Sequence, residues 1–442
     1  MFAGLAASAS AQTTEITITG ATAFRQATMR AIYDAYASAG AAGTTFNVAH
    51  DFNGANISQL IASNRAIFKG TFPGITGTTV IRTSFNGSTE GLNAIAGNNN
   101  PTFLTEAALT TGNFTAGIKD LTSSPTETLR PKFSFSDVYQ STSPVDNEVL
   151  NPVGSSAVGI VTFAMIANEG APENLTNVTI QQARALWAEG IQPLSLFTGD
   201  PADTKLVLAT GRNDGSGTRS AYLTEWTFGV ANLVKQYTAV NGGTSSSGNG
   251  SISKLTLVPA NGIGSGAFST NRTSDASVLW GNTAPGNGGY SSSSALRTLM
   301  GYTSSNVTIY NGVSNDPEFE NKDIVLVTWL STADSLNAAN NGAKILGYNG
   351  VKVTPMAAAG SYQSSGFNEA DFKKIATGAY SAWSFQHLYY HGSLSANEQT
   401  WYNAMKATYL PSGLQITANG VRLNDVSVER PGGDGFPIVA PL

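Results

Sequence analysis

Four stretches of this chain read as β-strands that end in a polar turn, and in three of them a helix-like apolar stripe follows the turn at once. A strand that leads directly into a helix is the repeating unit of sheets that carry helices on their faces. This pattern therefore constrains the fold more than any other feature of the sequence. The four stretches are 15–39, 78–97, 132–141 and 205–234.

The first stretch begins with the alternating sequence EITITG at 15–20, which predicts a strand. Apolar residues then recur at helical spacing from Phe24 to Tyr36, and Gly40 ends the predicted helix. Thr22 lies in the turn between the two elements. At such a turn the first backbone N–H groups of the helix have no partner within it, and they point beyond the strand end.

The other three stretches place further polar side chains at strand ends. In the second, the turn 86–89 separates a predicted strand from a predicted helix. In the third, Asp137 follows the strand-like sequence FSFS. In the fourth, the turn 212–218 precedes an apolar stripe that predicts a helix as far as Val234.

Alternating strands and helices predict an α/β fold with mostly parallel sheets. In such folds, ligands gather at the carboxyl ends of the strands. All four polar turns lie at strand ends of this kind, so we expect the functional site where they meet.

Length and composition narrow the function classes. At 442 residues, the chain suits two lobes or domains rather than one core. Charged residues make up 12% of it, about half of the roughly 25% that is usual, and polarity comes instead from Ser, Thr, Asn and 47 glycines, as in many exported proteins. A net charge of -5 argues against nonspecific nucleic-acid binding, which needs excess Lys and Arg. The absence of cysteine excludes disulfides and Cys-based metal sites or nucleophiles.

The N-terminal segment resembles part of an export signal. A short apolar run is followed by Ala9-Ser10-Ala11 before Gln12, the small-x-small pattern at which signal peptidase cleaves. We therefore expect residues 1–11 to be a partial signal peptide read from an internal start. A frayed tail of alanine and serine is the alternative. The sequence holds no uninterrupted apolar run long enough to span a bilayer.

The residue types of the fourth turn suit a tetrahedral oxyanion, whose oxygens each need a donor in a dry site. Gly217 lets backbone N–H groups turn inward, Ser216 and Thr218 add hydroxyls, and Arg212 supplies a two-pronged guanidinium. A carboxylate repels such an anion unless the anion carries a proton to donate. Asp137 in the same site would select a protonated oxyanion such as hydrogenphosphate and reject sulfate.

Each of these residues also has a purely structural explanation. Asp-Gly-Ser-Gly is a common turn sequence, Ser88 lies where a helix cap would stand, and Asp137 alone suits a loop or a cap. Asp214 can orient Arg212 by pairing with it. None of these residues favours a binding site by itself; their combination with a family pattern does.

The pair His387 and His391 is spaced i, i+4, as two metal ligands on one helix face would be. The glutamate of the His-Glu-x-x-His motif is absent, so we expect a packed or surface helix here and no metal site. The sequence contains neither Gly-x-Ser-x-Gly nor a P-loop, which leaves serine hydrolases and P-loop NTPases without support.

Four short motifs stand in order along the chain: TGATAF (19–24), NGSTEG (86–91), FSFSDVYQS (133–141) and GRNDGSGTR (211–219). Together they resemble the phosphate-binding proteins of ABC phosphate importers, which have the type 2 periplasmic-binding-protein fold. The last motif matches the family's Arg-x-Asp-Gly-Ser-Gly-Thr signature at every specified position. Weaker likeness at 174–191, 349–355 and 378–390 extends the resemblance over most of 15–390.

The resemblance implies two α/β lobes, with mixed sheets flanked by helices and a ligand cleft between the lobes. We place lobe I at 12–157 and 378–442, with the C-terminal tail in its second part, and lobe II at 158–377. The family's motifs imply these ligand contacts: Thr22, Ala23, Ser88, Asp137, Arg212, Ser216, Gly217 and Thr218. The first motif is one residue short, so either Thr22 or Ala23 takes the place of the family's threonine. Thr89 is an alternative to Ser88.

The resemblance also implies a function. We expect a monomeric, non-enzymatic protein of the periplasm or cell surface that binds inorganic phosphate and serves an ABC permease, without a cofactor. The alternative is a surface, adhesive or assembly protein that has kept the fold, favoured by low charge and by long Ser/Gly/Asn-rich loops within 238–320. An enzyme acting on phosphorylated substrates would need a second base or a metal set, for which the sequence shows no candidate.

Overall fold

A computed structural model describes residues 13–110, 112–145, 147–153, 156–239, 250–258, 286–290, 292–311, 316–417 and 420–440. The predicted signal segment 1–11 and most of the polar loops between 240 and 291 lie outside the described residues. No helix in the described part of the chain is both long and apolar enough to cross a membrane.

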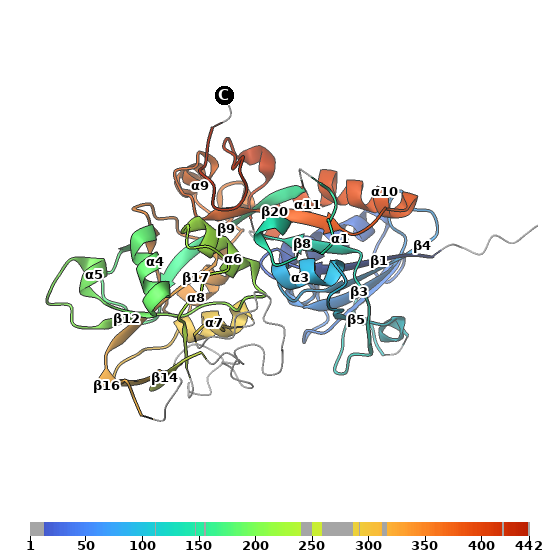
Figure 1. Cartoon of the computed structure of the whole chain (residues 1–442). Helices are drawn as coiled ribbons and strands as arrows, with labels where there is room; N and C mark the ends of the chain where they lie inside the picture. Colours follow the sequence, from blue (N-terminus) through green and yellow to red (C-terminus); the bar gives the residue numbers. More distant parts are fainter. Residues whose placement is uncertain are drawn as a thin grey trace, which may run out of the picture.

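One mixed sheet of twelve strands runs through the described molecule (Figure 1). Its strands, in spatial order, are β11 (Ile191–Pro193), β12 (Leu206–Ala209), β17 (Ile324–Ser331), β9 (Ala157–Ala167), β20 (Trp383–Tyr390), β8 (Phe133–Ser136), β1 (Thr13–Gly20), β4 (Thr78–Ser84), β3 (Arg65–Gly70), β2 (Phe46–His50) and β6 (Ile118–Asp120), with β18 (Lys344–Ile345) beside β9. Three small sheets of the described chain pair β13 (Tyr237–Ala239), β14 (Lys254–Leu257), β15 (Val307–Tyr310) and β16 (Phe319–Lys322); β10 (Asn177–Val178) and β19 (Gly347–Tyr348); and β5 (Thr102–Leu104) and β7 (Thr126–Thr128).

The pairings of the main sheet are mixed, so the expectation of mostly parallel strands is wrong. Strands β8, β1 and β4 are parallel neighbours, and β12 is parallel to β17. In the middle of the sheet, β9 is antiparallel to both β17 and β20, and β20 is antiparallel to β8. The reason is that β9 and β20 carry the chain in opposite directions between the two halves of the sheet. One half contains β8, β1, β4, β3, β2 and β6, and the other contains β17, β12 and β11. The lobe boundaries at 157/158 and 377/378 stay a prediction.

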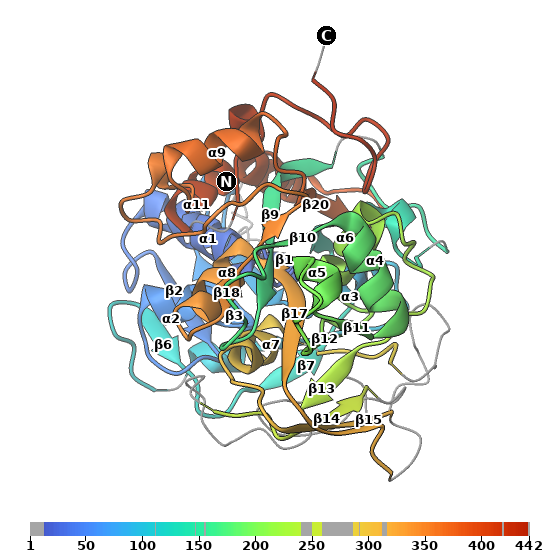
Figure 2. The same ribbon diagram turned by 90° about the vertical axis from the view of Figure 1, so that its left-hand side faces the viewer.

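The helices cover the faces of these sheets (Figures 1 and 2). They are α1 (Arg25–Ala39), α2 (Ile57–Ala62), α3 (Ser88–Ile95), α4 (Ile180–Glu189), α5 (Ser195–Thr198), α6 (Gly217–Glu225), α7 (Ser293–Met300), α8 (Thr332–Ala339), α9 (Glu369–Ala376), α10 (Ala396–Ala404) and α11 (Leu410–Thr417). The structure therefore has the expected α/β class, with mixed sheets flanked by helices.

The predicted strand and helix of the first stretch are confirmed as β1 and α1, because the alternating and helical apolar patterns are both satisfied. Ile16 and Ile18 are buried on the strand, and Ala27, Ala31 and Tyr36 are buried on the helix. Since tertiary packing stabilises an amphipathic helix through its apolar face, this stripe fixes how α1 lies on the sheet.

Helix α6 is shorter than predicted. It ends at Glu225 rather than near Val234, and Leu233 at the far end of the apolar stripe is exposed. The chain leaves the helix because Thr227 and Gly229 both have positive φ, at 53° and 92°. Apolar spacing alone did not reveal this break.

The predicted helix around His387 is also wrong, because residues Trp383–Tyr390 form strand β20. The strand is buried between β8 and β9, with every residue buried except Phe385 and Tyr390. Aromatic residues favour strands, and a strand buried on both faces shows no alternation of polar and apolar residues. The i, i+4 spacing was therefore not evidence of a helix.

Candidate functional site

Three of the four polar turns meet at one edge of the sheet, because they follow the parallel neighbours β8, β1 and β4. The N–H of Gly87 donates to the carbonyl of Gly20 at 3.0 Å, and the N–H of Ala21 donates to that of Phe135 at 2.8 Å. Gly20 has φ of 112°, and a Cβ added there would lie 1.9 Å from the Phe135 carbonyl oxygen. Only glycine allows these turns to approach so closely.

The fourth turn, between β12 and α6, packs on the turn before α3. The N–H of Glu90 donates to the carbonyl of Gly215 at 3.3 Å. A Cβ added to Gly87 would lie 2.7 Å from the same carbonyl oxygen. Because β4 and β12 stand in opposite halves of the sheet, the two halves touch backbone to backbone at this point.

Asp137 lies at the centre of this contact and is almost fully buried. The hydroxyl of Ser88 donates to Oδ1 of Asp137, and the hydroxyl of Thr218 lies 3.5 Å from Oδ2 as a donor. A Cβ added to Gly217 would lie 1.9 Å from Oδ1. The structure thus brings together four predicted site residues, Ser88, Asp137, Gly217 and Thr218.

Burial raises the pKa of Asp137 from 3.8 to about 7. A hydrogen bond from its own backbone N–H, the nearby Arg212 guanidinium and the Thr218 hydroxyl oppose this rise, while Asp434 adds to it. A carboxyl group that titrates near neutral pH in a buried position is typical of functional sites, although structural networks also produce it.

Arg212 is buried beside this cluster. Its Nε donates to the carbonyl of Tyr290 at 3.1 Å, and its Nη1 donates to the hydroxyl of Ser293 at 2.7 Å. Burial lowers the pKa of Arg212, and the nearby carboxylates of Asp334 and Asp137 oppose that effect. These contacts fix the orientation of the guanidinium near the Asp137 carboxyl group.

The remaining predicted site residues lie in two places. Ser216 is buried as the N-cap residue of α6. Thr22 and Ala23 line a cavity of about 570 Å³, and neither Ser88 nor Asp137 lines it among the described residues. Both Thr22 and Ala23, the two candidates for the place of the family's threonine, therefore face the same cavity.

Thr89, the alternative to Ser88, is fully buried in the first turn of α3. Its hydroxyl has no hydrogen-bond partner among the described residues. A buried hydroxyl without a partner is unfavourable.

Sequence reasoning missed several residues that the fold brings to the site. Tyr290 and Ser293 accept hydrogen bonds from Arg212. The carboxylate of Asp334, on helix α8, acts to raise the pKa of Arg212. The one local signal was the serine run at 291–294, in which Ser292 caps α7 by accepting a hydrogen bond from the N–H of Ala295. A cap motif predicts a helix start but not its partner in space.

The two histidines do not lie together on a helix face. His387 is fully buried in β20, where Nδ1 lies 2.7 Å from the hydroxyl of Ser156, and His391 follows the strand end. Within the described ranges, no group of three or more His, Cys, Asp or Glu side chains is placed to hold a metal ion.

Comparison with known proteins gives only structural likeness. No protein-family model matches the chain, and no curated protein matches its sequence. An ABC-type phosphate transport receptor from Vibrio cholerae is similar at 10% identity and a TM-score of 0.43, over 92% of this chain and 99% of the receptor.

Two further solved structures are similar at 9% identity. PstS from Borrelia burgdorferi has a TM-score of 0.36, over 91% of this chain and 96% of its own. A possible phosphate-binding protein from Planctomyces limnophilus has a TM-score of 0.33, over 86% and 81%. At such low identity and TM-score these likenesses do not decide the ligand, which has to be argued from the residues of this chain.

Proposed function

We propose that this protein is an extracytoplasmic solute-binding protein, not an enzyme, and that it binds inorganic phosphate between its two lobes. The observation that carries the proposal is the convergence of polar turns from both halves on the buried Asp137 carboxyl group. Ser88 comes from one half, and Thr218, with Arg212 nearby, comes from the other. A ligand held by both halves would favour the closed arrangement, which a transporter can recognise as shape.

The chemistry of Asp137 supports a protonated oxyanion. As a carboxylate, it accepts a hydrogen bond from the hydroxyl of hydrogenphosphate, but it only repels sulfate, which carries no proton near neutral pH. Ser88 and Thr218 donate to Asp137 here, and because hydroxyl hydrogens rotate, the same groups can donate to a ligand oxygen. Arg212 would provide the charge-assisted donors.

Calorimetry on protein that has been unfolded, stripped of ligand and refolded tests this proposal. We expect phosphate to bind and sulfate to bind at least a hundredfold more weakly. Arg212→Ala should abolish phosphate binding, whereas the control Arg184→Ala, which removes an arginine from the exposed side of α4, should leave it unchanged. Equal binding of phosphate and sulfate would remove the role of Asp137, and full affinity of Arg212→Ala would place the site elsewhere.

Export and transport are part of the same proposal. We propose that the protein acts as a monomer in the periplasm or at the cell surface and delivers phosphate to an ABC permease. Mass spectrometry of the protein secreted by its host should show Gln12 as the first residue. Light scattering should show a monomer with and without phosphate. Self-association that ignores phosphate would instead favour the adhesive or assembly protein.

A further inference from the structure

A cavity of about 570 Å³ lies between the two halves of the molecule, next to the proposed phosphate site. One wall comes from the turns after β1 and β4, and the other comes from the N-terminal ends of α7 and α8. Four oxygen atoms, each as large as a water of roughly 30 Å³, fill only about 120 Å³. The volume lies in the range of roughly 300–1,000 Å³ that is usual for organic ligands.

The cavity adjoins the proposed phosphate site at two points. Ser293, which lines it, accepts the hydrogen bond from Nη1 of Arg212. Thr22 and Ala23, which the family motif places at the phosphate, also line it. Arg212 itself does not line the cavity, but a phosphate held between Thr22, Ala23 and the Ser293 hydroxyl would lie at the end of the cavity next to Arg212, with room for a substituent on one of its oxygens.

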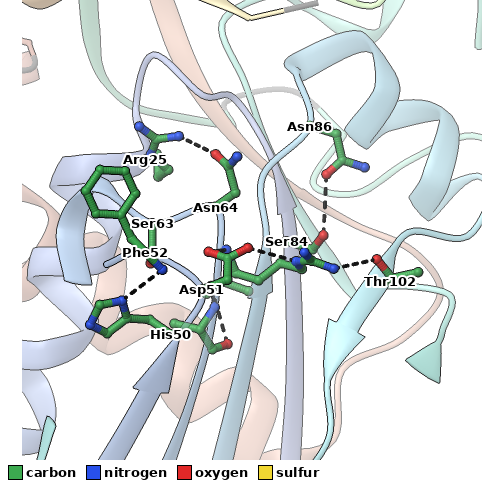
Figure 3. A network of polar contacts seen from close by, with 12 residues as sticks. Arg25, His50, Asp51, Phe52, Ser63, Asn64, Ser84, Asn86 and Thr102 are labelled. Carbon is green, nitrogen blue, oxygen red and sulfur yellow. Dashed lines mark hydrogen bonds and ion pairs between the residues drawn. The ribbon is translucent and has the colours of Figure 1, made fainter. Parts of the chain in front are cut away.

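The charged residues that line the cavity are Arg25, Arg297 and Asp334, which leaves one net positive charge. Arg297 pairs with Asp334, with 3.1 Å between Nη1 and Oδ1. Arg25 donates instead to the amide oxygen of Asn64, and its Nε has no hydrogen-bond partner among the described residues (Figure 3). A net positive cavity in a chain of net charge -5 favours an anionic ligand.

Most of the remaining lining consists of neutral hydrogen-bonding side chains. Hydroxyls come from Thr22, Ser292, Ser294 and Ser331, and amides come from Gln26, Asn64, Asn86 and Asn337. Such groups both donate and accept, as the hydroxyls of a polyol do. Phe52, which is 46% exposed, adds an apolar surface against which the C–H groups of a sugar ring can pack.

We propose that the cavity binds the hydroxylated organic part of a phosphate monoester, such as a sugar phosphate, whose phosphate group occupies the Arg212 end. Arg25, which lines the cavity and carries a positive charge, donates charge-assisted hydrogen bonds to the organic part. This inference rests on the proposed function for its phosphate end, and it extends the ligand class from inorganic phosphate to small polyol esters.

Competitive calorimetry with four probes tests the inference: inorganic phosphate, glycerol 3-phosphate, glucose 6-phosphate and glucose. We expect both esters to bind, to compete with inorganic phosphate, and to bind at least as tightly as it does, while glucose alone does not bind. Arg25→Gln should weaken ester binding about tenfold or more and leave inorganic phosphate unchanged, because loss of a charge-assisted hydrogen bond has about that effect.

The matched control is Arg30→Gln on the same helix, where the arginine pairs with Asp34 and does not line the cavity. It should leave all affinities unchanged. Binding of phosphate without binding of either ester would overturn this inference and leave the proposed function standing. Binding of the esters alone would overturn inorganic phosphate as the ligand and would keep phosphate esters as the ligand class. Binding of neither overturns both, and unchanged ester affinity of Arg25→Gln overturns the role of the cavity.

Discussion

The hydroxyl of Thr218 lies 3.5 Å from Oδ2 of Asp137, although 81 residues separate the two in the chain. Helix α6 and the end of β8 therefore meet on one buried carboxyl group. A ligand that binds at Asp137 has to replace or reorient this contact, because Ser88 and Thr218 both donate to the Asp137 carboxyl group. The stability of the ligand-free protein should report on it.

Substitution of Asp137 by asparagine should change how stability depends on pH. The folded pKa is about 7 and the usual value is 3.8, so the folded state binds the proton more tightly, and stability falls as pH rises from about 4 to about 7. Three pKa units correspond to about 4 kcal/mol. We expect urea unfolding of ligand-free Asp137→Asn to lack most of this fall and the variant to be more stable than wild type at pH 8. Identical pH profiles would contradict the buried, titrating carboxyl group.

Substitution of Gly217 by alanine should separate the two halves at the site. The added Cβ would lie 1.9 Å from Oδ1 of Asp137 and 2.5 Å from both Cβ and Oγ of Ser88, so the backbone has to shift. Overpacking of this kind costs about 1–3 kcal/mol. We expect Gly217→Ala to lose phosphate binding and to unfold at lower urea concentration. Binding that survives with normal stability would mean that the two turns are not packed as described.

The C-terminal segment should stabilise the protein through one buried ion pair. Arg430 donates to Glu225 at the end of α6 at 2.8 Å and also to the carbonyl of Ser381, and both charged side chains are nearly buried. Removal of one partner leaves an uncompensated charge, which costs about 3–5 kcal/mol. We expect Arg430→Met to be destabilised by that amount in urea unfolding and the double variant Arg430→Met, Glu225→Met to recover much of it. If the losses of unfolding free energy caused by the two single substitutions simply add in the double variant, Arg430 and Glu225 do not stabilise each other.

Local sequence patterns predicted those parts of the site whose position depends on residues nearby in the chain. The turns after β1, β4, β8 and β12 follow from strand and helix periodicity, and Ser88, Asp137 and Thr218 lie at their predicted strand ends. The pairing of Arg212 with Tyr290 and Ser293 could not be predicted, because 78 and 81 residues separate the partners. Long-range contacts of this kind depend on sheet order, which local periodicity does not encode.

The same limit explains the errors in secondary structure. The aromatic run of β20 matches helical and strand spacing equally well, and only its position between β8 and β9 decides for a strand. Arg25 and Arg297, which both line the cavity, lie in helices whose sequences show no sign of a binding site. They are 272 positions apart in the chain. Their proximity to one cavity is a consequence of how the two halves close.

The three histidines of the chain can be followed separately by NMR, because each gives its own imidazole signal. Burial lowers the pKa of His387 to about 3 and also lowers the pKa values of His50 and His391. His387 should therefore stay neutral from pH 8 down to about 4. Because its folded pKa lies below the usual 6.5, it destabilises the fold as pH falls below 6.5. We expect His387→Gln to reduce that acid sensitivity. An imidazole at position 387 that titrates near 6.5 would show that β20 is not buried between β8 and β9.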